Sequence, residues 1–401
     1  MNTPETLRGA LFGSTASLFE APSDPTQLRS VIRNPSAVLF GDGTADFTGV
    51  EASALGSRAL LVTYGSARND DENGPVSRVL RSLDSAGVRV ELFELRGEPD
   101  HQAVEACAAR VRAVDAELVI GIGGGSILDT AKAASALARN GGSWSDYQFG
   151  ARSLTKAGVP VIAIPTTAGT GSEATITAVI LHRERGLIKS VSSPLMLPRV
   201  VIVDPTLTWS CPPRLTALVG LDAITHAIES YLSPRANGLT RAFSRQALSL
   251  LVDPLLRAVR DGTDYDARSS LALGSHLAGQ ALAAGVGAAH ILAQPISATL
   301  GVAHGEALAA VFGAVLDFDE HPSPLFADIA AFFGPNNRPL SHAVREFMAT
   351  IGLPTTLSAI GGRQRDIPVI LSKVSESTGH IWTSARPVTL DDLGRILQAS
   401  M

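Results

Sequence analysis

The chain has 401 residues, of which 45% are hydrophobic and 18% are charged, a composition that excludes disordered and fibrous proteins. Its formal net charge of −5 argues against nucleic acid or an anionic membrane as the main partner. Two cysteines, Cys107 and Cys211, are too few for a disulfide scaffold or a four-cysteine zinc module. At about 100–200 residues per domain, the length predicts roughly two domains.

We expect a cytoplasmic protein, because neither an export signal nor a membrane-spanning segment is evident. Residues 1–5 contain no basic side chain, and no apolar stretch follows them. The least polar part of the chain, residues 277–316, is interrupted by polar side chains that include Gln280, His290 and His304. A lipid-facing helix would not carry so many polar groups in one span. This stretch therefore predicts a core helical region that contains a site.

Residues 1–34 predict an irregular lead-in segment, and an α/β pattern follows it. Short runs rich in Val, Ile or Leu are bounded by Gly, Pro or Asp, which is typical of strands buried on both faces of a parallel sheet. Helical spacing at 75–86 and 101–114 separates some of these runs, so the alternation predicts an α/β layer architecture. The predicted strands are 37–40, 59–63, 88–93, 118–122, 159–164 and 200–203.

The strand pattern stops after Asp204 and Pro205. From there to the end of the chain the pattern is almost wholly helical, broken by prolines and glycines. We therefore predict a boundary near Pro205, with an α/β domain over 1–205 and an all-helical domain over 206–401. Thr389, which two aspartates follow closely, is expected to cap the last helix.

A glycine turn joins a predicted strand to a predicted helix. The strand at 118–122 runs into Gly123, Gly124, Gly125 and Ser126, and helical spacing follows. Glycines let backbone N–H groups approach a ligand closely, and a helix N-terminus offers unpaired N–H groups that suit a pyrophosphate. Ser126 stands where the usual dinucleotide motif has its last glycine, so a tight turn without a ligand is the alternative.

A second polar turn follows the next predicted strand. Residues 165–173 contain Thr166, Thr167 and Thr170 together with two glycines. This place at the carboxyl end of a strand is where ligands bind in open α/β sheets. Two such turns after successive strands favour a nucleotide crevice over a hydroxyl-rich loop that only caps a helix.

Polar residues in apolar helical segments indicate a metal site. Asp222 and His226 are four residues apart, so they share one face of a helix, although an inert, hydrogen-bonded Asp–His pair has the same spacing. His290 and His304 lie in strongly apolar surroundings, where an unpaired polar group is costly. One carboxylate oxygen and three imidazole nitrogens would suit Fe(II) or Zn(II), with room for a substrate oxygen.

These motifs, taken in order, resemble those of the iron-containing (group III) alcohol dehydrogenases. The resemblance extends from Ala37 to Leu397 and rests on the glycine turn with Asp129 and Lys132, the 165–173 turn, the 220–230 segment and the spacing of the two later histidines. It implies a Rossmann-like dinucleotide-binding domain and an all-α C-terminal domain, the architecture shared with dehydroquinate synthase. The active site would lie in the cleft between them.

The resemblance also implies roles for individual residues. Asp222, His226, His290 and His304 match the family's four metal ligands. The related maleylacetate reductases typically carry Asn at the position of Asp222, which argues against that branch. Members are usually homodimers or larger, so we expect a homo-oligomer. The cofactor-binding positions would be Gly123, Gly124, Gly125, Ser126, Asp129, Thr166, Thr167 and Thr170.

Gln294 departs from the family pattern. Many of these dehydrogenases carry a second histidine at this position, near the substrate and the proton-release path. A glutamine can hydrogen-bond a substrate there but cannot titrate near neutral pH. We therefore expect Gln294 in the catalytic site, with water as the proton source or with a respecialised substrate pocket; neutral drift is the alternative.

The end of the second predicted strand indicates the nucleotide. An Asp there accepts hydrogen bonds from the ribose 2′-OH and repels a 2′-phosphate. Here the strand ends in Tyr64 and Gly65, and Ser66 and Arg68 follow, which favours the 2′-phosphate of NADPH. NADH is the alternative, because acidic residues follow at 70–72.

Together these features predict a metal-dependent, NAD(P)H-linked alcohol dehydrogenase or reductase of aldehydes or ketones. Fe(II) or Zn(II) would bind the carbonyl oxygen of a small-molecule substrate and stabilise the charge that grows as nicotinamide C4 delivers hydride. The alternatives are a non-redox lyase or cyclase of the dehydroquinate-synthase type that uses NAD and zinc, a maleylacetate-reductase-like enzyme, and a degenerate member that only binds.

Overall fold

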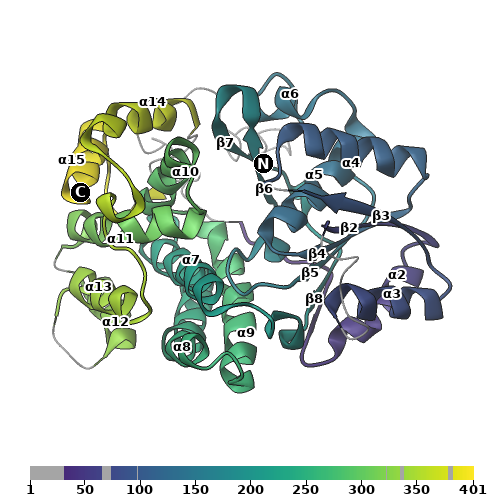
Figure 1. The fold of residues 1–401 in the computed structure, drawn as a ribbon, viewed down its shortest axis with the longest axis horizontal. Helices are drawn as coiled ribbons and strands as arrows, with labels where there is room; N and C mark the ends of the chain where they lie inside the picture. Colours follow the sequence, from purple (N-terminus) through teal and green to yellow (C-terminus); the bar gives the residue numbers. More distant parts are fainter. Residues whose placement is uncertain (1–30, 66–73, 97, 322, 335–337, 378–382) are drawn as a thin grey trace, which may run out of the picture. The chain divides into compact units, whose positions relative to one another are not determined.

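The computed structural model describes residues 31–65, 74–96, 98–321, 323–334, 338–377 and 383–401 (Figure 1). Most of the predicted lead-in segment lies outside them. The chain divides into two compact units. The α/β unit contains Arg33–Ala223 and Ser249–Gln280, and the helical unit contains Ile224–Leu248 and Ala281–Met401. Because the chain passes between these units more than once, the division does not test a boundary at Pro205, which stays a prediction.

A six-stranded parallel sheet runs through the α/β unit in the order β1-β8-β5-β4-β2-β3. Each strand agrees with one of the apolar runs to within about two residues, so the predicted strands and the Rossmann-like fold class are confirmed. The strands are β1 (Ala37–Phe40), β2 (Arg58–Tyr64), β3 (Arg89–Leu95), β4 (Leu118–Gly123), β5 (Val161–Pro165) and β8 (Val200–Val203).

Helices cover both faces of this sheet. Leu60 and Val62 of β2 pack into one apolar core, and Leu61, between them, packs into the core on the other face. The continuous apolar runs are thus buried on both sides, as expected for a parallel sheet. Figure 1 shows α4 (His101–Ala113), α5 (Gly125–Asn140) and α6 (Trp144–Gln148) on one side, and α2 (Thr48–Ser53) and α3 (Pro75–Ser85) on the other.

The order of the strands reverses beside β2. The chain runs from β2 outward to β3 and then crosses back to β4, on the other side of β2. Ligands of open α/β sheets bind outside the carboxyl ends of the strands at such a point. The carboxyl end of β4 leads into the glycine turn, and that of its neighbour β5 leads into the second polar turn. Both predicted turns therefore follow neighbouring strands at the ligand-binding edge.

The sequence pattern missed an antiparallel hairpin, formed by β6 (Thr177–His182) and β7 (Leu187–Ser192). Burial alternates along β6, so only one face of the strand is covered, and Ala178 and Ile180 pack into a core shared with α4 and α5. A strand covered on one face shows alternation instead of the continuous apolar run that marks the central strands.

A helix from late in the sequence also packs in the α/β unit. Ala272 of α9 (Tyr265–Ala281) contacts a small core formed by α5 and two central strands. Its partners there are Leu128, Ala163, Val201 and Val203. No local pattern in the sequence distinguishes this helix from those of the helical unit.

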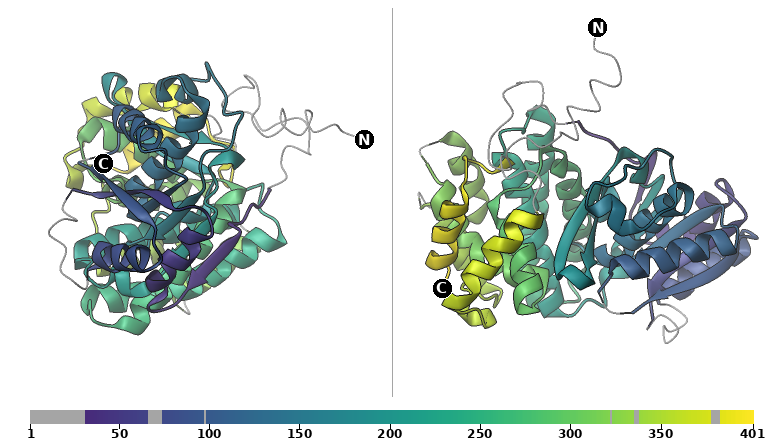
Figure 2. Two further views of the ribbon diagram at one scale, coloured as in Figure 1. Left: turned by 90° about the vertical axis from the view of Figure 1, so that its right-hand side faces the viewer. Right: turned by 90° about the horizontal axis from the view of Figure 1, so that it is seen from above.

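The helical unit confirms the predicted helical pattern, and no strand follows Val203 among the described residues. Thr389 caps the last helix as predicted, because its hydroxyl accepts a hydrogen bond from the Asp392 N–H at 3.1 Å. Two further helices, α7 (Pro213–Leu232) and α8 (Gly238–Arg260), continue across the division between the units. The other main helices, drawn in green to yellow in Figure 2, are α10 (Ala288–Leu300), α11 (His304–Asp319), α12 (Pro324–Ala330), α13 (Leu340–Thr350), α14 (Ile367–Ser377) and α15 (Leu390–Ala399).

Within the described ranges, no single helix is long and apolar enough to cross a membrane. One broken pair, Tyr265–Ala284 followed by Ala288–Leu300, passes that test by length and composition when its two parts are taken together.

Candidate active site

Three polar side chains lie along one face of α7. Asp222, His226 and Glu229 follow one another at spacings of four and three residues, and α7 is one continuous helix through all of them. All three are buried, with exposed fractions of 5%, 7% and 5%. A buried carboxylate or imidazole is costly unless another group satisfies it. The partners of these residues therefore determine what the face can do.

Glu229 binds the start of α10. One of its oxygens accepts a hydrogen bond from the Ala289 backbone N–H at 2.8 Å, and the other lies 2.6 Å from His290 Nδ1. Gly287, just before the helix, makes room for this carboxylate, because a Cβ there would lie 2.7 Å from Glu229 Oε1. A carboxylate at this position favours the tautomer of His290 that is protonated at Nδ1, in which the lone pair is on Nε2.

The structure brings Asp222, His226 and His290 together. Each offers one ligand atom, and these atoms lie within 4.8 Å of one another. The rings of His226 and His290 stack, with centroids 4.3 Å apart and 14° between their planes. A carboxylate oxygen with imidazole nitrogens fits Fe(II) or Zn(II), and Glu229 supplies the outer carboxylate that metal-binding histidines usually have. The chemistry of this buried donor set therefore fits a metal ion.

His304 is the first residue of α11 and is half-buried. Its ring centroid lies 5.7 Å from that of His290, with 40° between the planes. His304 stands outside the group whose ligand atoms all lie within 4.8 Å of one another. Its role as a fourth ligand stays a prediction.

Gln294 lies on the same face of α10 as His290, one turn later, and it is half-buried. Gln294 therefore offers hydrogen-bonding groups beside His290 but does not titrate. Its part in catalysis stays a prediction.

Glu229 was not among the predicted site residues, although its spacing from Asp222 carries a signal. Asp222, His226 and Glu229 occupy positions i, i+4 and i+7 of α7, which lie on one face of a helix. Glu229 therefore faces the same surroundings as the two predicted site residues. Its partner His290 lies 61 residues further along the chain, so no local pattern indicates the contact.

The glycine turn packs tightly against the second polar turn. A Cβ on Gly123 would lie 2.6 Å from Ile127 Cγ1, and a Cβ on Gly125 would lie 2.8 Å from Thr170 Oγ1. The Thr166 backbone N–H donates to the Gly123 carbonyl at 3.0 Å. Packing alone therefore demands glycine at positions 123 and 125, whether or not a ligand binds there.

Hydroxyl groups of the second polar turn lie beside the start of α5. Gly124 immediately precedes the helix, and a Cβ there would lie 3.4 Å from Thr167 Oγ1. The four predicted hydroxyl residues are half-buried: Ser126, Thr166, Thr167 and Thr170. An N-terminus of a long helix beside such hydroxyls is a favourable place for a phosphate.

Asp129 and Lys132 form a buried ion pair beneath the turns. Lys132 Nζ lies 3.1 Å from Asp129 Oδ1, and the Lys132 side chain is completely buried. Asp129 accepts hydrogen bonds from Ser172 Oγ at 2.5 Å and from the Val179 N–H at 2.9 Å, and Lys132 donates to the Ser172 carbonyl at 2.9 Å. Burial lowers the pKa of Lys132, and the charge of Asp129 opposes that shift. The pair thus holds the second polar turn on α5.

The predicted phosphate-binding residues Ser66 and Arg68 lie outside the described residues. The described strand β2 ends in Tyr64, which is exposed, and the following Gly65 N–H donates to the Leu95 carbonyl at 3.0 Å. No carboxylate stands at these last two described positions.

Comparisons with known proteins agree on one family. A family model described as iron-containing alcohol dehydrogenase matches residues 35–205, and one for the C-terminal part of the Fe-containing alcohol dehydrogenase family matches residues 216–401. Long-chain-alcohol dehydrogenase 1 of Geobacillus thermodenitrificans is 35% identical over 381 residues, which cover 91% of this chain and 95% of that protein.

Solved structures show the same likeness. The crystal structure of a 1,3-propanediol oxidoreductase has a TM-score of 0.87 and 30% identity, covering 93% of this chain and 100% of that one. The NADH-dependent butanol dehydrogenase A of Thermotoga maritima has a TM-score of 0.83 and 25% identity, covering 92% of this chain and 98% of that one.

Replacing Lys132 by methionine should destabilise the protein strongly. The Lys132→Met variant keeps most of the side-chain volume but leaves the buried Asp129 charge without its partner, which costs about 3–5 kcal/mol in comparable cases. The double variant Asp129→Asn/Lys132→Met should lose less than the two single losses added together, because neither charge is then left alone. Urea unfolding of the four proteins measures this coupling, and additive losses would contradict it.

Asp319 is another buried carboxyl, and its ionisation affects the stability of the protein. It ends α11 with 4% exposure, and burial, aided by the charge of Glu229, raises its pKa from 3.8 to about 8. The folded-state pKa is above the unfolded value, so this group's contribution to stability is complete below about pH 4 and is lost as the pH rises through about 8.

The Asp319→Asn variant should therefore gain stability relative to the wild type as the pH rises. We expect similar melting temperatures near pH 4.5 and an advantage of several degrees for the variant at pH 9, measured at matched metal content. Parallel melting profiles for the two proteins between these pH values would show that Asp319 ionises normally in the folded state.

Proposed function

This chain belongs to the iron-containing alcohol dehydrogenase family and is an oxidoreductase acting on CH–OH groups; we propose that Asp222, His226, His290 and His304 hold its metal ion. The observation that carries the proposal is the buried convergence of Asp222, His226 and His290, with Glu229 hydrogen-bonded behind His290. A carboxylate set to orient a histidine through Nδ1 is the usual outer partner in a metal site.

When bound, a divalent iron supplies Lewis acidity toward a carbonyl or alkoxide oxygen, and a nicotinamide cofactor supplies or accepts the hydride. The chain's own residues would hold the metal ion and orient its ligands. Burial of Asp222 and the two stacked histidines excludes water, which strengthens their attraction for a cation. Glu229 keeps His290 in the tautomer that presents Nε2. Together with His304, these three donors would hold the ion beside the place of the substrate oxygen.

We assign Gln294 to substrate orientation. It lies one turn after His290 on α10, so it offers an amide group beside the proposed metal ligands. The amide donates and accepts hydrogen bonds but releases no proton near neutral pH. The proton that accompanies alcohol formation therefore comes from solvent in this proposal.

The nucleotide is proposed to bind at the glycine turn. Gly124, Gly125 and Ser126 at the start of α5 suit a pyrophosphate, and Thr166, Thr167 and Thr170 of the neighbouring turn add hydroxyl groups. Asp129 acts here as a positioning residue, because it holds the second turn through Ser172.

NADPH is the proposed nucleotide, since Tyr64 and Gly65 stand where an NAD-specific fold carries an acidic residue. The similar butanol dehydrogenase is described as NADH-dependent, so both nucleotides belong in the test. We also propose a homo-oligomer, located in the cytoplasm. The free cysteines Cys107 and Cys211 fit the reducing conditions of that compartment.

The function is tested by oxidation of NADPH and NADH with a panel of aldehydes and ketones, after anaerobic loading with Fe(II) or, separately, Zn(II). We expect metal-dependent oxidation with at least one carbonyl compound and a higher kcat/KM for NADPH. The matched variant His290→Ala should lose this turnover and still bind nucleotide, measured by fluorescence titration. Loss of turnover and nucleotide binding together would contradict the assigned roles. A protein that binds metal and nucleotide but oxidises neither nucleotide would favour the non-redox alternative.

Replacing Glu229 by glutamine should weaken metal binding without removing a proposed ligand. Loss of the outer carboxylate typically costs about 10–100-fold in metal affinity, so Glu229→Gln should need correspondingly more Fe(II) for half-maximal activity. Turnover at saturating Fe(II) should recover in large part. Glu346→Gln, on an α13 side chain that is 61% exposed, is the charge-matched control. Equal Fe(II) titrations for both variants would remove Glu229 from the metal centre.

A further inference from the structure

A second cluster of metal-ligating side chains lies within the α/β unit. His101 is the first residue of α4, His182 is the last residue of β6, and Glu184 lies in the turn that joins β6 to β7. Each offers one ligand atom, and these atoms lie within 4.8 Å of one another. No residue of this cluster belongs to the proposed active site, so the cluster needs a separate explanation.

One carboxylate oxygen faces both imidazoles. Glu184 Oε2 lies 3.2 Å from His101 Nε2 and 3.4 Å from His182 Nδ1. His182 Nδ1 is buried and makes no hydrogen bond to the described residues, so the contact is not a well-directed hydrogen bond. Ligand atoms around a tetrahedral ion with bonds of about 2.0–2.1 Å are separated by roughly 3.3–3.4 Å. The two oxygen–nitrogen separations are close to this value, and the two imidazole nitrogens lie within 4.8 Å of each other.

Neighbouring side chains orient two of the three residues of the cluster through atoms that do not face the cluster. Ser145 Oγ lies 3.1 Å from His182 Nε2, and Gln102 donates to Glu184 Oε1 at 2.8 Å. The contact with Ser145 leaves His182 Nδ1 directed at the cluster, and the contact with Gln102 leaves Glu184 Oε2 directed there. Such outer hydrogen bonds set the orientation of ligands in metal sites.

The backbone brings the three ligands together without an ion. Asp100, the cap of α4, pairs with Leu181 in an isolated parallel bridge, and the Leu181 N–H donates to the Pro99 carbonyl at 3.1 Å. The arginines on either side of Glu184 in the sequence contact other side chains: Arg183 binds Asp100 at 2.7 Å, and the Arg185 guanidinium lies 4.1 Å from the ring centre of Phe149. The backbone therefore brings the three side chains together, and Arg183 and Arg185 each have a contact outside the cluster.

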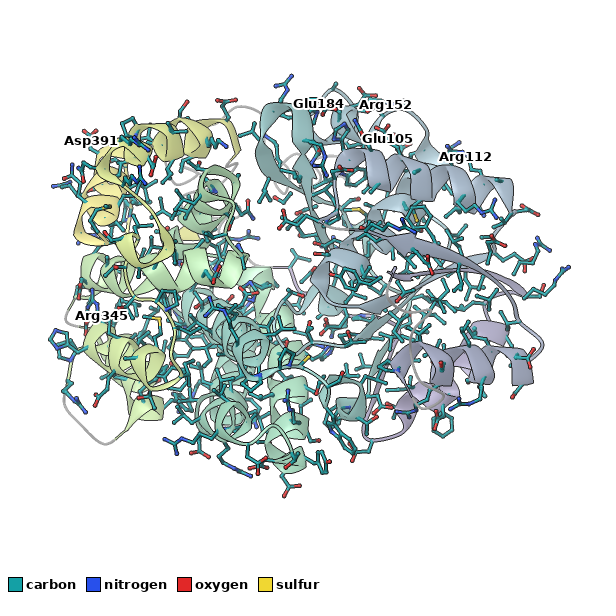
Figure 3. All side chains as sticks on the ribbon, in the orientation of Figure 1. Glu105, Arg112, Arg152, Glu184, Arg345 and Asp391 are labelled. Carbon is teal, nitrogen blue, oxygen red and sulfur yellow. The ribbon has the colours of Figure 1, made fainter. Side chains whose placement is uncertain are left out.

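The ring geometry repeats that of the proposed catalytic centre. His101 and His182 stack with centroids 4.3 Å apart and 5° between planes, and His226 and His290 stack at 4.3 Å and 14°. The difference is exposure. Both histidines are 7% exposed, but the Glu184 side chain is 54% exposed, and Figure 3 labels it. Water can therefore reach the carboxylate side and complete the coordination.

We propose that His101, His182 and Glu184 form a second metal site, which binds a divalent transition-metal ion such as Zn(II) through two imidazole nitrogens and one carboxylate oxygen. A water molecule takes the fourth position. Because the ligands come from α4, β6 and the β6–β7 turn, the bound ion ties the hairpin to the helix and stabilises the α/β unit. The proposal does not rest on the proposed function, since it involves different residues.

The test counts zinc in the full-length protein after equilibration with Zn(II) and removal of the excess. Glu184→Gln should hold one zinc fewer per chain than the wild type, because an amide oxygen is a much weaker ligand than a carboxylate. Glu98→Gln, an exposed glutamate of the same unit outside the cluster, should hold the wild-type number. Counting the difference between variants makes the result independent of whether zinc also enters the proposed catalytic centre.

Two further measurements separate a metal site from a structural contact. Added Zn(II) should raise the melting temperature of the wild type and of Glu98→Gln more than that of Glu184→Gln. Turnover of the Fe(II)-loaded Glu184→Gln variant should equal that of the wild type. His182→Gln should repeat the loss of one zinc. Equal zinc content in wild type, Glu184→Gln and His182→Gln would overturn the proposal.

Discussion

A buried carboxylate must have a partner, and in the helical unit Glu229 meets this requirement by holding the start of another helix. Its two oxygens bind the Ala289 N–H and His290 Nδ1, so one side chain satisfies an orphan donor of the helix N-terminus and orients the imidazole. The same contact explains Gly287, where any Cβ would press on the carboxylate. The position of His290 against Asp222 and His226 therefore depends on Glu229 as well as on the packing of α10.

In the α/β unit, the partner of a buried carboxylate is the positively charged side chain of a lysine. Lys132 and Asp129 are buried in α5, and their remaining hydrogen bonds go to Ser172 and to the edge of β6. The second polar turn is thereby tied to the helix whose N-terminus lies beside the glycine turn. A pair of this kind contributes little net free energy by itself, but losing one member leaves an unpaired charge. Its value is that it determines where the hydroxyl groups of the turn stand.

The sequence predicted features that depend on neighbouring residues, and it missed contacts between residues that are far apart along the chain. The six central strands are visible because burial on both faces makes each one a continuous apolar run, whereas β6, buried on one face, shows no such run. The cap of the last helix at Thr389 and the spacing of Asp222 and His226 on α7 are local patterns, so the sequence indicates both. Other contacts join residues far apart in the sequence. Glu229 contacts His290 across 61 residues, and His101 contacts Glu184 across 83, so only the fold brings each pair together.

Charge balance gives a reason why the interior around α7 suits the divalent cation that we propose there. Asp222 and Glu229 are both buried, so as two carboxylates they would repel each other and lose their hydration. A divalent ion beside Asp222 and the histidines offsets that charge. Asp319 is a third buried carboxyl. Burial, aided by the charge of Glu229, raises its pKa to about 8, so Asp319 stays protonated at neutral pH and adds no further negative charge to this interior.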